Sequence, residues 1–118
     1  MLKSKTLGTA MVLIFSVIIY PQVALSDGFN GEDFLKWPRD SQNSLVTYSI
    51  TMTAIVASQV HQDIATCIDD WYPPDGRIKQ QRQGFILDTI RSNPSYHPQA
   101  VILAVLQQQC GSFGRQTD

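Results

Sequence analysis

The chain has 118 residues, with nine Lys and Arg against ten Asp and Glu, so its formal net charge is −1. This length allows one modest domain. The near-neutral, slightly acidic balance excludes nucleic acid and anionic membrane surfaces as partners, because both require a basic face.

Residues 1–26 have the three parts of a cleavable secretory signal peptide. Two lysines lie within the first five residues, an apolar run covers residues 11–20, and Ala24-Leu25-Ser26 supplies small residues before a cut ahead of Asp27. The run is shorter than the roughly 20 residues of a spanning helix, and no cysteine stands at the cut to carry a lipid. We therefore expect export with no stable membrane anchor after cleavage.

Cleavage leaves residues 27–118 as a single domain, with seven Lys and Arg against ten Asp and Glu. Both cysteines, Cys67 and Cys110, lie in this part. An even cysteine count in an exported chain predicts a disulfide, and closing a loop of this length contributes about 4 kcal/mol in the chain-entropy model. The Cys-x-x-Cys spacing of a redox enzyme is absent.

The first predicted helix is short: Asn30 can cap it, and Pro38 ends it. A long helix is then expected from Ser41 to about Asp70, because apolar residues recur at close to the helical period. The face expected to be buried comprises Leu45, Tyr48, Met52, Ile55, Val60, Ile64, Cys67 and Trp71.

Residues 46–53 complicate this prediction, since they alternate apolar and polar and contain β-branched residues that suit a strand. The alternation stops at residues 54–57, and no turn residue separates the segment from the helical pattern that follows. A helix is therefore favoured, and a strand stays open.

A turn is predicted over residues 70–76, which contain Pro73-Pro74 and Asp75-Gly76. Asp75 can cap a helix over residues 76–92, whose predicted inner face is Ile78, Phe85, Ile86, Thr89 and Ile90. Gly84 either weakens this helix or permits close packing.

Pro98 opens a last helix that ends at Cys110, before a stop at Gly111 and a loose tail over residues 112–118. Residues 101–106 are apolar on all sides, which places this helix at the centre of the core. The predicted fold is a compact all-α bundle of about four helices, in which one disulfide joins two helix ends.

No catalytic motif, phosphate loop or zinc signature is recognisable, so we expect neither enzyme activity nor a cofactor. His61, Asp63 and Cys67 lie close in sequence, but His61 and Asp63 fall on different faces of a helix, and no metal site is predicted there. His97 precedes Pro98 and suits a cap or a buried hydrogen bond.

The most suggestive surface is the segment that follows Cys67. Its aromatic and acidic residues are typical of a protein-binding site on a stiff support, and the alternative is a hydrophobic lid with solvated carboxylates. The candidate contact residues are Asp69, Asp70, Trp71, Tyr72 and Asp75.

Four features occur together in this chain: a Gly-Glu-Asp-Phe-Leu segment at 31–35, Cys67, an Asn-Pro-Ser-Tyr-His-Pro segment at 93–98, and an apolar helix that ends at Cys110. In these features the chain resembles the Rap/Tai-type immunity proteins of type VI secretion systems. The chain departs from the family pattern in two places: a frequent further cysteine early in the chain is replaced by Trp37 or has no equivalent, and a common glycine of the long helix is missing, with Thr53 or Ala54 near that place.

The resemblance implies a periplasmic protein that binds a cell-wall-degrading toxin and occludes it. The opening segment and the two-cysteine helical design also resemble the HdeA-type acid-stress chaperones, which is the first alternative. An accessory part of an envelope complex is the second. Whether the chain also forms a homodimer is left open by the sequence.

Overall fold

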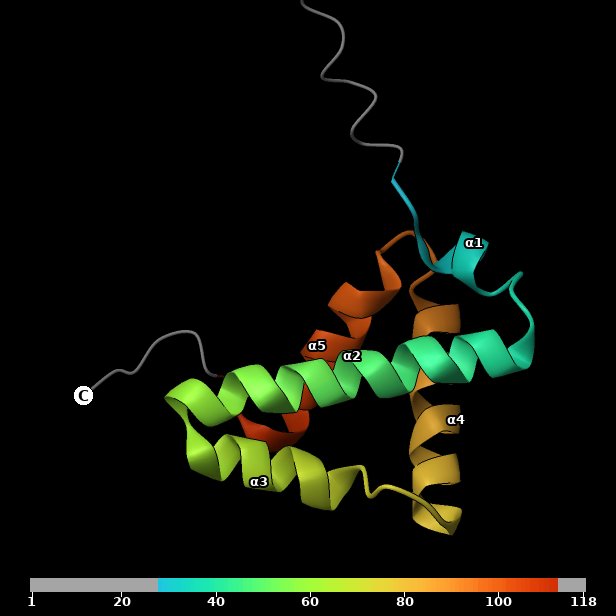
Figure 1. The fold of residues 1–118 in the computed structure, drawn as a ribbon. Helices are drawn as coiled ribbons and strands as arrows, with labels where there is room; N and C mark the ends of the chain where they lie inside the picture. Colours follow the sequence, from blue (N-terminus) through green and yellow to red (C-terminus); the bar gives the residue numbers. More distant parts are fainter. Residues whose placement is uncertain (1–27, 113–118) are drawn as a thin grey trace, which may run out of the picture.

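Five helices follow one another in the computed structural model, which describes residues 28–112 (Figure 1). They are α1 (Gly31–Phe34), α2 (Arg39–Val60), α3 (Gln62–Trp71), α4 (Arg77–Ser92) and α5 (Pro98–Cys110). The described part contains no strand, so the predicted all-α fold is confirmed and residues 46–53 are helical. The predicted signal peptide and most of the predicted tail lie outside the described residues.

Local signals set several helix ends as expected. The Asn30 side chain accepts a hydrogen bond from the Asp33 N–H at 3.0 Å, which caps α1. His97 caps α5, because its Nδ1 accepts from the Gln99 N–H at 3.1 Å, and Pro98 occupies the first turn. Gly111 ends α5 with a φ of 102°, a conformation that glycine adopts at little cost.

The predicted long helix over residues 41–70 is wrong, because the chain breaks at His61 into α2 and α3 (Figure 1). The His61 backbone is extended, yet its N–H donates to the Ala57 carbonyl and its own carbonyl accepts from the Ile64 N–H. One uninterrupted helix would be about 45 Å long, which exceeds the diameter of so small a domain. The break lets α3 fold back along α2.

The face of α2 predicted to be buried is also wrong. Val46, Ile50, Ala54 and Ala57 pack inward, together with Ser49. The predicted inner residues Tyr48, Met52, Ile55 and Val60 are exposed instead. In α3 the predicted face is largely right, since Ile64 is buried and Cys67 and Trp71 are partly buried.

Two further predictions about α4 need correction. Ile86 and Ile90 are buried as expected and Leu87 joins them, but Ile78 and Phe85 are about half exposed. The N-cap of α4 is Gly76, which makes no side-chain cap hydrogen bond, so Asp75 does not cap this helix.

The core lies around α5, which contacts α2, α3 and α4. Val101, Ile102, Val105 and Leu106 are buried in this helix, which confirms its central place, while Leu103 and Ala104 on its other side are exposed. No helix among residues 28–112 is long and apolar enough to cross a membrane.

Candidate functional site

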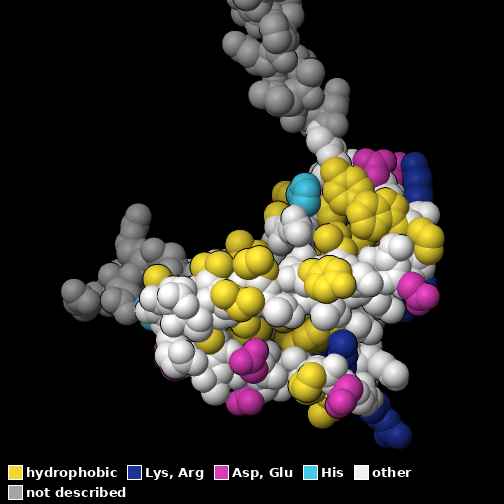
Figure 2. Space-filling view, in the orientation of Figure 1, with side chains coloured by type: hydrophobic (Ala, Val, Ile, Leu, Met, Phe, Trp, Pro, Cys, Tyr) yellow, Lys and Arg dark blue, Asp and Glu magenta, His cyan; other side chains and the backbone are white. Residues whose placement is uncertain are grey.

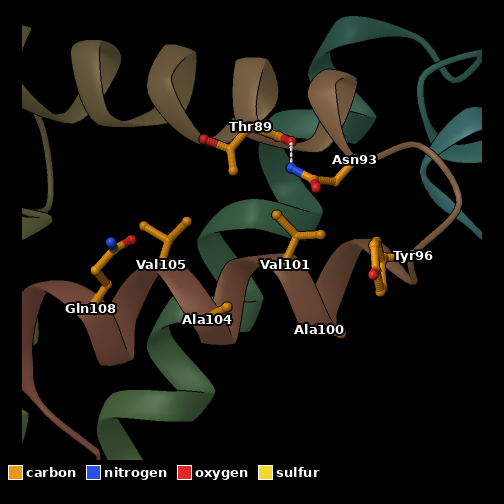
Figure 3. Close-up of a pocket in the computed structure, with 8 residues that line it drawn as sticks. All are labelled: Thr89, Asn93, Tyr96, Ala100, Val101, Ala104, Val105 and Gln108. Atoms are coloured by element: carbon orange, nitrogen blue, oxygen red, sulfur yellow. Dashed lines mark hydrogen bonds between the residues drawn. The ribbon is translucent and has the colours of Figure 1, made fainter.

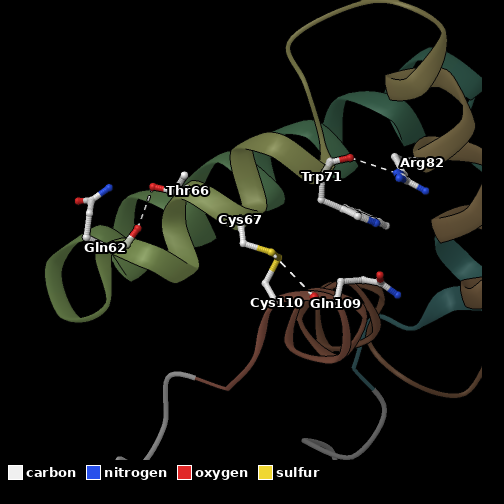
Figure 4. Close-up of a disulfide and its surroundings, with 7 residues drawn as sticks. All are labelled: Gln62, Thr66, Cys67, Trp71, Arg82, Gln109 and Cys110. Carbon is white, nitrogen blue, oxygen red and sulfur yellow. Dashed lines mark hydrogen bonds between the residues drawn. A yellow bond between two sulfur atoms is a disulfide. The ribbon is translucent and has the colours of Figure 1, made fainter.

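The predicted disulfide between Cys67 and Cys110 is present, with the two Cα atoms 5.7 Å apart (Figure 4). It ties the middle of α3 to the last residue of α5. Because Cys67 lies one helical turn before Trp71, the bond fixes the C-terminal end of α3 against the core helix. The support expected beneath the acidic segment, residues 69–75, therefore exists.

The acidic segment is only partly a loop. Asp69, Asp70 and Trp71 form the last turn of α3, and Tyr72 is the residue that caps this end. Asp75 lies in the short connection to α4. The three carboxylates are exposed, Trp71 is half-buried, and Tyr72 is buried with 6% of its surface accessible.

Tyr72 anchors the segment to the rest of the bundle. Its hydroxyl lies 2.8 Å from the Thr47 hydroxyl of α2 and accepts a hydrogen bond from Gln83 Nε2 of α4 at 2.9 Å. Its ring also faces the Lys79 ammonium, 5.8 Å from the ring centroid. A side chain held by two helices in this way orders the connection and presents little surface to a partner.

Trp71 is held by α4 (Figure 4). The Arg82 guanidinium lies over the indole ring at 4.9 Å, and its Nε donates to the Trp71 carbonyl at 3.1 Å. The ring also meets Phe85 edge-on, with the centroids 6.4 Å apart. Stacking and a hydrogen bond thus fix the indole at the base of the segment, with part of it still accessible.

The nearby cations do not neutralise the carboxylates. Lys79 Nζ donates to the Pro74 carbonyl at 3.1 Å, and Arg82 is engaged by Trp71. Within residues 28–112 the one ion pair joins Arg91 to Asp88, on the far part of α4. Asp69, Asp70 and Asp75 are therefore exposed at the surface without an ion pair.

The position of two of these charges is electrostatically unfavourable for the isolated chain. Asp69 and Asp70 lie in the last turn of α3, where the helix dipole is negative, and that turn contains no basic residue. Each such charge costs a few tenths of a kcal/mol at an exposed helix end. A basic group from outside the chain would be attracted to this turn.

A second surface feature, which the sequence did not suggest, is a groove of about 390 Å³ between α4 and α5 (Figure 3). Its walls are mainly apolar, and no Asp, Glu, Lys, Arg, His or Cys lines it. It therefore offers room for an apolar group. The lining residues are Thr89, Asn93, Tyr96, Ala100, Val101, Ala104, Val105 and Gln108.

A third feature is the apolar stripe on the outer face of α2, most of whose residues, though not Val56, were predicted to be buried. We define it as Tyr48, Met52, Ile55, Val56 and Val60, each of which has between 49% and 71% of its surface accessible. Figure 2 shows hydrophobic side chains spread along α2 on this face of the molecule.

The two histidines both lie at the start of helices, His61 before α3 and His97 before α5. In the described part of the chain, no three His, Cys, Asp or Glu side chains are grouped closely enough to hold a metal ion.

Comparisons with protein-family models, with curated proteins and with solved structures found no match for this chain.

Proposed function

We propose that this chain is a periplasmic immunity-type protein that binds a secreted cell-wall-degrading toxin and occludes its active site. The observation that carries the proposal is the acidic turn at the end of α3, where Asp69 and Asp70 stand exposed and unpaired against the negative end of a helix. The disulfide is compatible with an oxidising compartment such as the periplasm.

The binding mode would be complementary in shape and charge, without chemistry of its own. Asp69, Asp70 and Asp75 would face a basic cleft, with the accessible edge of Trp71 as an apolar anchor among them. Tyr72 would act from beneath, since its buried hydroxyl joins α2 and α4 and holds the turn in place. A turn ordered before binding loses little entropy on binding.

The unfavourable placement of the carboxylates supports a role in binding over a role in folding. Charges that stabilised the fold would sit at helix N-terminal ends or in ion pairs, as Asp63 does in the first turn of α3 and Asp88 does with Arg91. Asp69 and Asp70 do neither. Sites that trade stability for function commonly have this character.

The first experiment concerns the partner. The product of the gene next to this one should bind the protein one-to-one, and periplasmic production of this protein should rescue cells that make the toxin in their periplasm. Lack of binding to the neighbouring gene product, together with lack of rescue, would refute the proposal.

The second experiment concerns the surface, and it compares Asp70→Lys with Asp63→Lys. Both reverse one exposed charge on α3, at opposite ends of the helix. Asp70→Lys should weaken toxin binding at least about 100-fold while raising the free energy of unfolding by about 0.3–1 kcal/mol, because a cation favours the helix C-terminal end.

Asp63→Lys is the matched control, which should leave binding nearly unchanged and lower stability slightly. Calorimetric titration and urea unfolding give the two readouts. Equal affinities of the two variants for the toxin would show that the acidic segment is not the contact, even where the immunity function itself holds.

A further inference from the structure

A cleft of about 250 Å³ lies between α2 and α3 and reaches the acidic turn at the end of α3. It exists because the break at His61 folds α3 back along α2, so that the two helices are close neighbours (Figure 1). Drug-sized ligands occupy pockets of about 300–1,000 Å³, so a cleft of this size suits a single side chain. Its lining residues are Ile50, Thr51, Ala54, Ile55 and Ser58 of α2, Gln62, Ala65 and Asp69 of α3, and Tyr72.

The floor of the cleft is apolar. Ala54 of α2 and Ala65 of α3 are buried, with 8% and 3% of their surface accessible, and their small side chains leave the space between the helices open. Ile50 and Tyr72, which are also buried, extend this floor. A long side chain that carries a charged group at its end can lay its methylene groups on such a floor and keep the charged group at the rim.

The polar atoms around the cleft are mainly acceptors. Among the described residues that line it, Asp69 alone is charged; it is exposed, and the one ion pair of residues 28–112 does not involve it. The Ser58 hydroxyl already donates to the Ile55 carbonyl at 2.6 Å, so it offers its oxygen to a ligand. A carboxylate and a hydroxyl oxygen at the rim favour a ligand group that donates hydrogen bonds and carries positive charge.

The chain itself does not supply this cation. In the described part of the chain, no Lys or Arg lines the cleft. On α4, Lys79 donates to the Pro74 carbonyl and Arg82 to the Trp71 carbonyl, so both are engaged elsewhere. The negative end of the α3 dipole adds to the attraction for a cation at Asp69. A cation in the cleft would therefore come from a partner.

An arginine side chain matches the cleft better than a lysine side chain does. Its guanidinium is planar, has five N–H donors, and can bond both oxygens of one carboxylate. It is also more weakly hydrated than an ammonium, so its transfer from water into a cleft costs less free energy. Donors that Asp69 does not use suit the oxygens of Thr51 and Ser58.

We propose that the cleft between α2 and α3 receives an arginine side chain of the protein partner, which lies along Ala54 and Ala65 and pairs with Asp69. The inference rests on the proposed function, because it names the group with which the toxin engages the acidic turn. It also makes two adjacent carboxylates unequal, since Asp69 lines the cleft and Asp70 does not.

The first test needs no toxin and uses N-acetyl-arginine amide as the probe, with protein purified from the periplasm of cells that express the full chain. In NMR titrations the amide signals of Ala54, Ala65 and Asp69 should shift, with a dissociation constant on the order of 1 mM. N-acetyl-citrulline amide, which has a similar shape without the charge, should bind at least about 10-fold more weakly.

Two variants are matched for this titration. Asp69→Asn should weaken binding of the arginine probe at least about 10-fold, whereas Asp70→Asn should bind it nearly as the wild type does. Cleft signals that do not move at about 50 mM probe would overturn the proposal, and so would equal losses in the two variants. Equal binding of N-acetyl-lysine amide would overturn the assignment to arginine.

The second test uses the product of the neighbouring gene and compares Thr51→Arg with Gln59→Arg. Both residues are exposed and polar on α2, and only Thr51 lines the cleft. Thr51→Arg would place the chain's own guanidinium in the cleft and should weaken toxin binding at least about 10-fold, whereas Gln59→Arg should bind as the wild type does. Circular dichroism would show that each variant keeps its helices.

The outcomes separate this inference from the proposed function. A toxin that binds the wild type and both arginine variants equally would overturn the inference and leave the immunity function in place. A wild type that binds no toxin would refute the immunity function, and the titration with the arginine probe would then decide whether the cleft accepts a guanidinium group.

Discussion

Gly31 lies where the first turn of α1 meets the loop between α4 and α5, and a side chain there would crowd its neighbours. A Cβ at this position would come within 3.0 Å of Ile90 Cγ2 and 3.3 Å of the Pro94 backbone. The close approach allows the Gly31 N–H to donate to the Tyr96 carbonyl at 2.8 Å and the Glu32 N–H to donate to Pro94 at 3.1 Å. The glycine thus lets α1 dock on the bundle.

Gly84 is the opposite case, since a Cβ there would meet nothing within 4 Å. Of the two roles that the sequence left open for Gly84, close packing is therefore not required. Gly84→Ala should raise the free energy of unfolding by about 0.5–1 kcal/mol through helix propensity.

Gly31→Ala should lower the free energy of unfolding by about 1–3 kcal/mol through overpacking. Urea unfolding of the two variants measures both, and a stable Gly31→Ala would show that the α1 contact yields easily.

Gln42 shows what a sequence pattern cannot reveal at this scale. It is buried, and its Nε2 donates to the Leu35 carbonyl at 3.1 Å and to the Trp37 carbonyl at 2.9 Å. These bonds join the end of α1 to the start of α2. A glutamine in a polar stretch produces no periodic pattern in the sequence, so its burial and its two hydrogen bonds are seen only in the folded structure.

At the scale of elements, α2 explains why residues 46–53 suggested a strand. Val46 and Ile50 face the core, whereas Tyr48 and Met52 face outward. Residues two apart in a helix lie about 200° apart around its axis, so two interleaved apolar faces produce an apparent period of two. For the same reason the predicted buried face of α2 is the wrong one. Both apolar faces have helical spacing, and the sequence does not indicate which of them packs against the other helices.

Helix positions and ends were largely predictable, because caps, prolines and glycines act locally. The break at His61 was not, since it uses no glycine or proline and is imposed by the need to fold α3 back on α2. The acidic segment was found from composition and from its closeness to Cys67. The burial of Tyr72 could not be predicted, because its partners Thr47 and Gln83 come from α2 and α4 and are distant in the sequence.

The disulfide connects α3 and α5, and its removal should affect stability before binding. The double variant Cys67→Ala/Cys110→Ala opens a loop with a sequence separation of 43 residues. The chain-entropy model gives a loss of about 4 kcal/mol in the free energy of unfolding. We expect urea unfolding to show a loss of this order, with the far-UV helical signal of the folded state retained at low temperature.

Toxin binding in the same variant should fall by a smaller factor than in Asp70→Lys under conditions where the variant is folded. Tyr72 still links the segment to α2 and α4, so the acidic turn keeps most of its order. A variant that is as stable as the wild type would show that the bond does not constrain the unfolded chain as the loop length suggests.

At the scale of the whole molecule, the charged side chains contribute little to the stability of the fold. Among residues 28–112, no Asp, Glu, Lys, Arg or His is buried, and the one ion pair, Arg91 with Asp88, is itself exposed on both sides. Such a pair contributes about 0.3–0.5 kcal/mol. The fold therefore rests on its apolar core, its backbone hydrogen bonds and its disulfide, none of which requires an ionised carboxylate.

This layout predicts how the protein responds to acid, which separates the immunity proposal from an acid-stress chaperone. The exposed carboxylates lie at helix ends of both signs, Asp40 and Asp63 in N-terminal turns and Asp69 and Asp70 in the last turn of α3, so their contributions to stability oppose one another. With one exposed ion pair and no buried carboxylate among residues 28–112, acid removes few of the interactions that hold the fold together.

We therefore expect the far-UV circular dichroism at about pH 3 to match that at neutral pH, with little binding of a hydrophobic dye and a modestly lower midpoint in urea. A chaperone that acts by partial unfolding requires many carboxylates that are buried or held in ion pairs, whereas residues 28–112 contain one exposed ion pair and no buried carboxylate. Loss of the helical signal with strong dye binding and suppression of client aggregation at this pH would contradict the prediction and favour the chaperone.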